Sequence, residues 1–579
     1  MLSGPRSVTK EIRPTRKLLQ PGNIARASSE RHPSGEPMLH PVSIVADLDL
    51  AGELAAVSDD EARVQAPAKP VAVSAEMRRK AWALRSVLKV FTTKVDPNYG
   101  QPWQMCPQRA STGSAFVIDT QKRHILTNAH VVSNAVAVYV RRPGTAKKFK
   151  AEVVCEGKVC DLALLTVREE AFWVSDLPAL TFVDVPELQA SIAVAGYPVG
   201  GDSLSVTKGI VSRLTLVRYS PAARLLGIQV DSAINPGNSG GPAFADIEAG
   251  HVAGVAFSKQ VGSSTDNIGY VIPYRVISHF LKEHAEYGKY RGVPSPGFNT
   301  SDMENPAQKA FLKVPEDVSG VLVVSVDPLS AAAGALQVKD VLLEVGGQLV
   351  ADDGSVSFRD DERLEYSHLV RSMHVGDRLD LVILRQGERM EVSYNVGVKD
   401  YLVPLVHSVD CQPTYFIVGG LVFTALTSPF MEMVFGGASK SRGRRSDIPV
   451  PVLVALSRDK QAVGQQVVIL VQVLAHEINA GYKYTVVPCE TFNGTKLDNL
   501  RHLADLVDSC TEPYLNFGLE GGRLITLDAR QAHSQGPEVL AINAIASDRS
   551  DNLRSAAPGV TPEEKNEEKN EEMNEEMKT

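Results

Sequence analysis

This sequence of 579 residues has few cysteines, and its net charge is small for its length. Long apolar runs are also missing from it. Its six cysteines are scattered, so no disulfide framework is expected and a reducing compartment is the default. No uninterrupted apolar run reaches the roughly 18 residues of a spanning helix, so we expect no integral membrane segment. The formal net charge is −8, and the last eighteen residues, with eight Glu and three Lys, supply −5 of it. Because the rest is nearly balanced, a nucleic-acid binder built on bulk charge is not expected.

Aromatic residues are absent from the first 80 positions, which hold eight prolines. Such a segment buries little surface, so we expect residues 1–78 to lack a stable fold. Its first 37 residues carry five Arg and two Lys against three Glu, which is compatible with an organelle transit peptide, and a plain extension is the alternative. No apolar core of a secretory signal is visible. We expect residues 541–579, which end in a Glu-rich repeat, to form a disordered acidic tail.

Short strands dominate the sequence from about residue 86 to residue 272, separated by Gly, Pro, Asn and Asp. This pattern is typical of an all-β barrel or sandwich. A helix over Tyr274–Tyr287 is expected next, because apolar residues recur four apart and Gly288 suits the position after a helix. Two β-rich modules of similar plan follow, with helix-like segments at Leu364–Met373 and Leu497–Val507.

The segment Gly237-Asn238-Ser239-Gly240-Gly241-Pro242 carries the strongest chemical signal. A serine hydroxyl is a poor nucleophile until a base takes its proton, and catalysis also needs donors for the developing oxyanion. Glycines around Ser239 let successive backbone N–H groups converge, so the N–H groups of Gly237 and Ser239 are candidates for an oxyanion hole. Taken alone, the motif is about as compatible with an incidental glycine-rich turn.

Two further motifs supply partners for Ser239. His130, in Thr127–Val132, follows a predicted strand, and Asp161 precedes the apolar run Leu162–Leu165. An Asp beside a buried strand needs a polar partner, which an imidazole N–H would provide. Each residue alone has an ordinary structural explanation. The order His130, Asp161, Ser239 in an all-β segment is that of chymotrypsin-like enzymes and not of α/β-hydrolases.

Residues 86–290 resemble the HtrA/Deg (DegP-like) serine proteases, and the wider resemblance, to the plant and algal organellar or nuclear Deg branch, spans about residues 80–540. The motifs that carry it include Thr127–Val132, Asp161–Leu165, Gly196–Pro198, Gly209–Ser212, Ala233–Pro242 and Asn267–Pro273. The resemblance implies a mainly β chain. A chymotrypsin-like double β-barrel protease domain at 79–290 would be followed by two PDZ-like α+β domains, at 291–400 and 401–540. We call these the protease region, the first PDZ-like module and the second PDZ-like module.

The resemblance also implies roles for particular residues. His130 would be the general base, Asp161 would orient it, and Ser239 would attack the peptide carbonyl. The primary substrate pocket would be lined near Ala233 and by three consecutive residues, Ala256, Phe257 and Ser258. No acid is evident there, so an apolar P1 residue is expected. Ser232 departs from the alanine usual in the family, which is expected to matter little.

In the first PDZ-like module, Ser319, Gly320 and Val321 fit the loop that grips a peptide carboxylate through backbone N–H groups. An ordinary strand-entry glycine is the alternative. Lys339 stands where the family prefers glycine. The second module has Gly464-Gln465-Gln466-Val467, without glycine at the close-approach position. We therefore expect it to dock within an assembly and not to take peptide ends.

The resulting expectation is an ATP-independent serine endopeptidase for protein quality control, without cofactor or metal, acting on unfolded or damaged proteins. By resemblance, a homo-oligomer built from trimers is expected, in chloroplast or mitochondrion, with the nucleus also open. One alternative is a chaperone or PDZ scaffold whose protease site is latent, distorted by loops such as Leu216–Leu226. A remote one is an ester hydrolase using Asp266 and His279. Cys155 with Cys160 as a redox pair, and Lys440–Arg445 as a nuclear signal, are each less favoured than plain structural roles.

Overall fold

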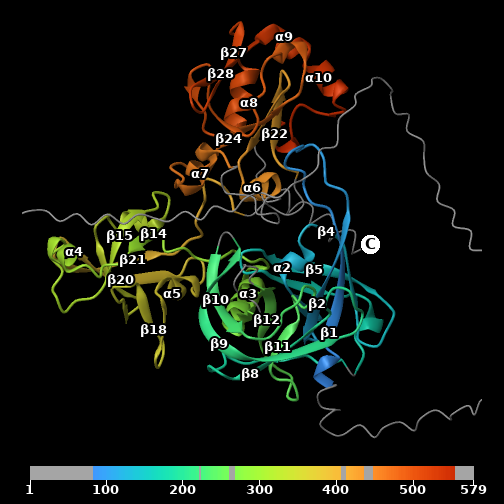
Figure 1. Ribbon diagram of the computed structural model, residues 1–579, viewed down its shortest axis with the longest axis vertical. Helices are drawn as coiled ribbons and strands as arrows, with labels where there is room; N and C mark the ends of the chain where they lie inside the picture. The colour runs from blue at the N-terminus through green and yellow to red at the C-terminus, as the bar shows by residue number, and fades with distance from the viewer. Residues whose placement is uncertain are drawn as a thin grey trace, which may run out of the picture. The chain divides into compact units, whose positions relative to one another are not determined.

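The structure is a computed structural model (Figure 1). It describes residues 82–175, 177–220, 223–259, 268–405, 412–435 and 448–554. The predictions for the first 78 residues, for the Glu-rich repeat and for the basic patch at 440–445 lie outside these residues. Within the described ranges, no helix combines the length and the apolar composition needed to cross a membrane.

The first sheet closes into a barrel, in the strand order β1-β2-β3-β6-β5-β4. Its strands are β1 (Val87–Lys94), β2 (Arg109–Asp119), β3 (His124–Thr127), β4 (Ala135–Arg141), β5 (Phe149–Gly157) and β6 (Leu162–Thr166). Two short helices accompany it, α2 (Ala129–Val132) and η1 (Glu170–Phe172). Side chains such as Val90, Phe149 and Leu165 fill the interior. Burying each contributes about 1.5–3 kcal/mol, so the barrel is a packed core.

The second sheet has the order β11-β8-β9-β10-β13-β12, and β11 pairs back onto β12. Strand β7 joins β12 in parallel. The strands are β7 (Thr181–Phe182), β8 (Ser191–Gly196), β9 (Ser205–Ser220), β10 (Ala223–Val230), β11 (Pro242–Asp246), β12 (His251–Lys259) and β13 (Gly269–Pro273). Because the outer strands pair with each other, this sheet is also closed, and the expected double barrel is confirmed.

Helix α3 (Tyr274–Tyr287) begins and ends where the sequence predicts. Gly288 adopts φ +68°, and its N–H donates to the carbonyl of His284 at 2.9 Å, which terminates the helix. A left-handed residue at this position favours glycine, since a Cβ would be strained there. The buried residues Ile277 and Phe280 join the core formed with the second barrel.

The first PDZ-like module holds a sheet in the order β14-β15-β16-β20-β21, with β17 on β16, and a separate β18–β19 pair. Its elements are β14 (Phe298–Ser301), α4 (Pro306–Phe311), β15 (Val321–Val326), η2 (Ala331–Gly334), β16 (Val341–Val345), β17 (Gln348–Leu349), β18 (Ser355–Arg359), β19 (Glu362–Glu365), α5 (Ser367–Arg371), β20 (Arg378–Arg385) and β21 (Glu388–Asn395). The helix predicted over Leu364–Met373 was wrong at its start. Leu364 pairs with Val356 of the neighbouring strand, and the helix covers Ser367–Arg371 only.

The second PDZ-like module has the strand order β22-β23-β24-β25-β27-β28, with β26 on β25. Its elements are β22 (Tyr415–Val418), β23 (Leu421–Ala425), α6 (Ser428–Phe435), α7 (Val450–Ser457), β24 (Val468–Val473), η5 (Glu477–Asn479), β25 (Val487–Phe492), β26 (Thr495–Lys496), α8 (Leu500–Asp508), β27 (Tyr514–Leu519), β28 (Arg523–Asp528), α9 (Ala529–Ser534), α10 (Gly536–Ile542) and η6 (Asp551–Leu553). Helices α6 and α7 were not predicted.

This packing continues past the boundary expected at residue 540. The hydroxyl of Ser550 accepts the N–H of Tyr415 at 3.1 Å, and the N–H of Ile417 donates to the carbonyl of Asp548 at 2.6 Å. Leu553 is buried in the core of the module. The segment 541–554 is therefore ordered. Asp548 and Ser550 accept hydrogen bonds from backbone N–H groups of β22, and Leu553 packs in the same core as side chains of β22.

Candidate active site

His130 and Asp161 are adjacent because of strand pairing. Strand β3 runs antiparallel to β6 with Thr127 opposite Ala163, so residues after β3 lie beside residues before β6. The Nδ1 atom of His130 is 2.7 Å from Oδ2 of Asp161, and the backbone N–H of His130 donates to Oδ1 at 2.9 Å. The side-chain amide of Asn128 donates to the carbonyl of Asp161 at 2.8 Å. These contacts fix the imidazole against the carboxylate.

The arrangement prepares His130 to accept a proton. With Nδ1–H directed at Asp161, the lone pair lies on Nε2, and 49% of the His130 side chain is exposed, against 10% for Asp161. Asp161 has φ +52°, a strained value for a residue with a side chain. Lys94, which sequence reasoning missed, donates from Nζ to the carbonyl of His130 at 2.5 Å, and burial lowers the pKa of Lys94 to about 8.

Ser239 lies in a loop that only glycine can build. Gly237 has φ +100° and Gly240 has φ +85°. A Cβ on Gly237 would collide with the carbonyl of Tyr197, and one on Gly240 would collide with the carbonyl of Ser114. The backbone N–H groups of Gly237 and Ser239 donate to no acceptor within the described residues. An oxyanion hole requires such unengaged donors, here the N–H of the serine itself and that of the glycine two positions before it.

Ser114 on β2 ties this loop to the first barrel, and sequence reasoning missed it. Its hydroxyl donates to the carbonyl of Gly237 at 2.7 Å and accepts the N–H of Tyr197 at 2.8 Å. Its backbone N–H donates to the carbonyl of Ser239 at 2.9 Å, and its carbonyl accepts the Thr127 hydroxyl at 2.7 Å. A serine next to the apolar run Ala115–Ile118 is the only sequence signal, because its partners are 83 and 123 positions away. The structure shows that this serine is fully buried.

The hydroxyl of Ser239 is hydrogen-bonded away from the imidazole in this conformation. It donates to the carbonyl of Phe257 at 3.4 Å, and no hydrogen bond joins Ser239 to His130 among the residues the structure describes. The structure therefore brings His130 and Asp161 into contact and places Ser239 across the seam between the barrels. Productive geometry requires the serine hydroxyl to turn toward Nε2.

The expected pocket residues differ in exposure. Ala233 is exposed, while Ala256 and Phe257 are buried. Ser258 pairs with Tyr270 in the sheet, and its side chain is outside the described part of the chain. Tyr219, which was not predicted, stacks on Phe257 with ring centroids 4.6 Å apart, and burial raises its pKa well above the usual value. The lining that the structure describes is apolar.

The predicted carboxylate loop of the first PDZ-like module is partly engaged already. Ser319 is exposed, and Val321 begins β15. The N–H of Gly320 donates to Oδ1 of Asp352 at 3.0 Å, and Oδ2 of that carboxylate pairs with Nζ of Lys309 at 2.5 Å. A peptide carboxylate would therefore have to use other N–H groups or displace Asp352. Lys339 has φ +80°, which explains the glycine preference at that position.

Two less favoured interpretations lose support. Cys155 and Cys160 are both free and buried, and burial raises the pKa of the Cys160 thiol to about 12, so it is a poor redox group. Among the residues of the rival ester-hydrolase hypothesis, Asp266 is outside the described part of the chain. His279 is already engaged, since its Nε2 donates to the carbonyl of Met373 at 2.8 Å.

Comparison with known proteins identifies a peptidase domain and a PDZ domain in this chain. Residues 113–255 match the trypsin-like peptidase domain family, and residues 403–552 match the PDZ domain family. The chain is 42% identical to Protease Do-like 2, chloroplastic, of Arabidopsis thaliana over 476 residues, which is 81% of this chain and 75% of the relative. This chain belongs to the Do-like (Deg/HtrA) serine protease family.

The chain is also similar to a second Do-like protease and to a solved HtrA-type protease. Protease Do-like 4, mitochondrial, of Arabidopsis thaliana is 38% identical over 468 residues, covering 80% of this chain and 85% of the relative. The solved HtrA-type protease AlgW with tripeptide aligns over 55% of this chain and 97% of its own, with 26% identity and a TM-score of 0.44. The chain is a serine endopeptidase of the HtrA type, and the residues that match the trypsin-like peptidase family include His130, Asp161 and Ser239.

Proposed function

We propose that the chain is an ATP-independent endopeptidase that degrades unfolded or damaged proteins with His130, Asp161 and Ser239 as its triad. The observation that carries this proposal is the two-point contact of His130 with Asp161, through Nδ1 at 2.7 Å and through the backbone N–H at 2.9 Å. A carboxylate bound in this way selects the imidazole tautomer that a general base needs and stabilises the imidazolium that forms.

The proposed reaction begins when the Ser239 hydroxyl turns from Phe257 to His130. Nε2 takes the hydroxyl proton while Oγ attacks the peptide carbonyl carbon. The N–H groups of Gly237 and Ser239 receive the oxyanion, and His130 then returns the proton to the leaving amine. Water hydrolyses the acyl-enzyme through the same base. Asp161 orients the ring throughout and stabilises the imidazolium.

Substrate preference follows from the surroundings of Ser239. We expect an apolar P1 residue, because the described residues Ala233, Ala256 and Phe257 bring no charge to the pocket and Tyr219 stacks on Phe257. Exposed apolar segments distinguish an unfolded chain from a folded one, which fits a quality-control role. The first PDZ-like module is the proposed site for peptide ends, through Ser319 and Val321 beside the engaged Gly320.

A latent protease that acts as a chaperone or PDZ scaffold is the second candidate. It is favoured by one observation, the hydrogen bond of the Ser239 hydroxyl to Phe257 instead of His130. In this alternative, the resting site waits for a ligand or for assembly to reorient the serine.

Casein cleavage by the full chain separates the two candidates. Ser239→Ala and His130→Ala run beside the exposed controls Ser457→Ala and His251→Ala. We expect the parent and both controls to cleave and both triad variants to lose about a millionfold in turnover. Cleavage by Ser239→Ala at the parental rate would overturn the proposal. An inert parent that still suppresses client aggregation favours the latent form, and a serine-directed probe then reports whether Ser239 can be activated.

Assembly and location are part of the proposal. We propose a homo-oligomer built from trimers, tested by sedimentation velocity on the full chain. We propose an organellar location, because two relatives that match over most of this chain are named chloroplastic and mitochondrial. Imaging of a C-terminal fluorescent fusion, with and without residues 1–78, tests it. Loss of organellar signal only in the truncated form is the expected result, and equal signal would contradict a role for that segment.

A further inference from the structure

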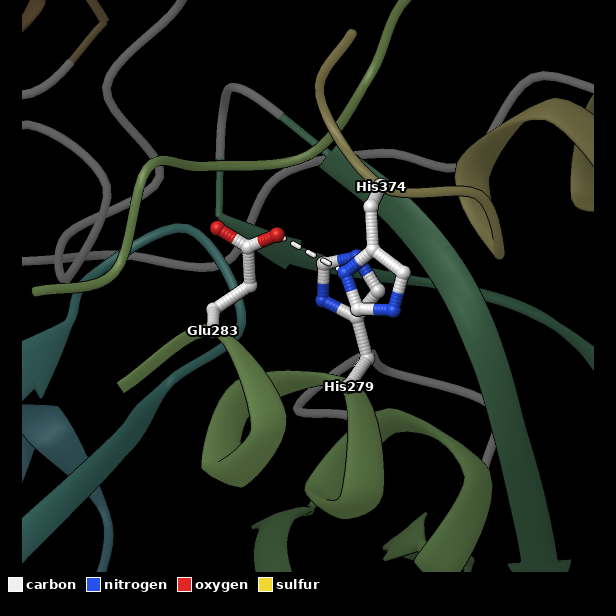
Figure 2. Close-up of side chains that lie close together, drawn as sticks. All are labelled: His279, Glu283 and His374. Carbon is white, nitrogen blue, oxygen red and sulfur yellow. Dashed lines mark hydrogen bonds and ion pairs between the residues drawn. The ribbon is translucent and has the colours of Figure 1, made fainter. Parts of the chain in front are cut away.

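A second cluster of reactive side chains joins helix α3 to the segment that follows α5 (Figure 2). Glu283 is fully buried, and His279 precedes it by one helical turn. His374, from the segment that follows α5 in the first PDZ-like module, completes the group. One ligand atom from each residue lies within 4.8 Å of the others, and Figure 2 shows the three side chains pointing toward one another.

The hydrogen bonds of the cluster define which atoms are available. The Nδ1 atom of His374 is 2.7 Å from Oε1 of Glu283. The Nε2–H of His279 donates to the carbonyl of Met373 at 2.8 Å, so its Nδ1 keeps the lone pair in the neutral ring. The two imidazole rings stack with centroids 4.4 Å apart and an angle of 9° between their planes.

We propose that His279, Glu283 and His374 form a binding site for a divalent cation of the zinc class. Two imidazoles and one carboxylate are a ligand set that Zn²⁺ and similar transition metals take in proteins, with further positions left for water. The spacing of His279 and Glu283 places both on one face of α3. His374 then enters as a neutral ring that carries its proton on Nε2, which frees Nδ1 for the metal. Because the two rings are stacked and each lone pair lies in its ring plane, one ring turns when the ion binds.

The surroundings supply the outer contacts that metal ligands need. A metal-bound histidine usually donates its other N–H to a carbonyl or a carboxylate, and His279 already does so to Met373. Arg291 donates from Nε to Oε2 of Glu283 at 2.7 Å and from a terminal nitrogen to Oε1 at 2.8 Å. These bonds lower the pKa of Glu283 to about 2, so the carboxylate is ionised at neutral pH.

Arg291 also limits the affinity of the site. The positive charge of Arg291 repels a cation bound to the same carboxylate. Each carboxylate oxygen has two lone-pair directions, however, so the Glu283 carboxylate can accept hydrogen bonds from Arg291 and bind a metal ion at the same time. The alternative is a purely structural network in which Glu283 bridges Arg291 and His374 and no metal enters. The two differ at His279, which stacks on His374 and hydrogen-bonds to the carbonyl of Met373, outside that bridge, but which would be a ligand in the metal site.

A bound cation would join α3 of the protease region to the first PDZ-like module. His374 is 91 positions from Glu283 in the sequence, which is why no metal-ligand spacing was visible there. Because three ligands come from two parts of the chain, metal binding stabilises their contact by mass action.

The test uses the full-length protein with Ser239→Ala to prevent self-cleavage, titrated with zinc chloride by calorimetry and followed by thermal unfolding. We expect one zinc per chain and a rise in melting temperature. His279→Ala should weaken binding by at least about 100-fold, and His374→Ala similarly, since loss of even an outer-shell partner costs 10- to 100-fold. His284→Ala is the matched control on the same helix, beside His124, and should bind as the parent does.

Cobalt chloride provides a second readout, because the chain also contains cysteines. A site built from His and Glu gives visible absorption without a thiolate charge-transfer band. Absence of stoichiometric zinc binding, binding by His279→Ala equal to that of the parent, or a thiolate band lost with a cysteine each overturns the proposal. A fold check by circular dichroism on every variant excludes unfolding as the cause of lost binding.

Discussion

Ser114→Ala is the substitution that most directly tests how the two barrels position the nucleophile loop. The Ser114 hydroxyl makes two buried hydrogen bonds, to the carbonyl of Gly237 at 2.7 Å and from the N–H of Tyr197 at 2.8 Å. Alanine removes both bonds and adds no new atom. The buried carbonyl and the buried N–H are then left without these partners.

The magnitude follows from the cost of unsatisfied buried groups. Each group left without a partner costs about 1–3 kcal/mol, so the expected loss in free energy of unfolding for the two groups is about 2–6 kcal/mol. For a region of 150–250 residues, each kcal/mol shifts the melting temperature by about 2–4 °C, so the shift should be at least about 4 °C. Since Gly237 carries a proposed oxyanion donor, a displacement of about 1 Å should also lower kcat by about a hundredfold.

The assay is thermal unfolding in the Ser239→Ala background, together with casein cleavage in the parent background. Ser457→Ala is the control, because the Ser457 side chain is exposed and its hydroxyl donates to the carbonyl of Val454 in its own helix. It should change stability by less than about 0.5 kcal/mol and leave cleavage intact. If Ser114→Ala melts within about 1 °C of its parent and cleaves at the parental rate, the link from β2 to the loop has no role in positioning it.

Three further outcomes are expected. Asp161→Asn should lower kcat by about 10⁴-fold with an unchanged circular dichroism spectrum, because an amide favours the wrong imidazole tautomer; a fall under tenfold would remove Asp161 from the mechanism. Gly237→Ala should abolish cleavage and slow labelling by a serine-directed probe, since φ +100° and the Tyr197 carbonyl leave no room for a Cβ; parental labelling would contradict this. Arg385→Ala should destabilise the first PDZ-like module by about 3–5 kcal/mol in urea unfolding, because the 2%-exposed Asp340 loses its two-point partner at 2.7 and 2.8 Å; an unchanged midpoint would refute it.

Local patterns in the sequence were enough for much of the fold. Helix α3 was predicted at both ends, because its apolar spacing and Gly288 are signals within a few residues. The end of the strand Glu362–Glu365, at Leu364 and Glu365, was predicted as helix. Helix propensity depends on neighbouring residues and does not report the pairing of this strand with Ser355–Arg359 across a turn. The end of the second PDZ-like module was placed too early for a similar reason, because Leu553 is buried by residues far earlier in the chain.

The sequence by itself determined which chemistry this chain could carry. His130, Asp161 and Ser239 lie in motifs whose residue types and order are typical of chymotrypsin-like serine proteases. The glycines at 237 and 240 indicate a tight loop whose backbone leaves no room for a Cβ. The tertiary structure decided which groups meet. Ser114 beneath the loop and His374 beside Glu283 depend on contacts across 123 and 91 positions, which packing of the barrels and modules creates and local propensity does not encode.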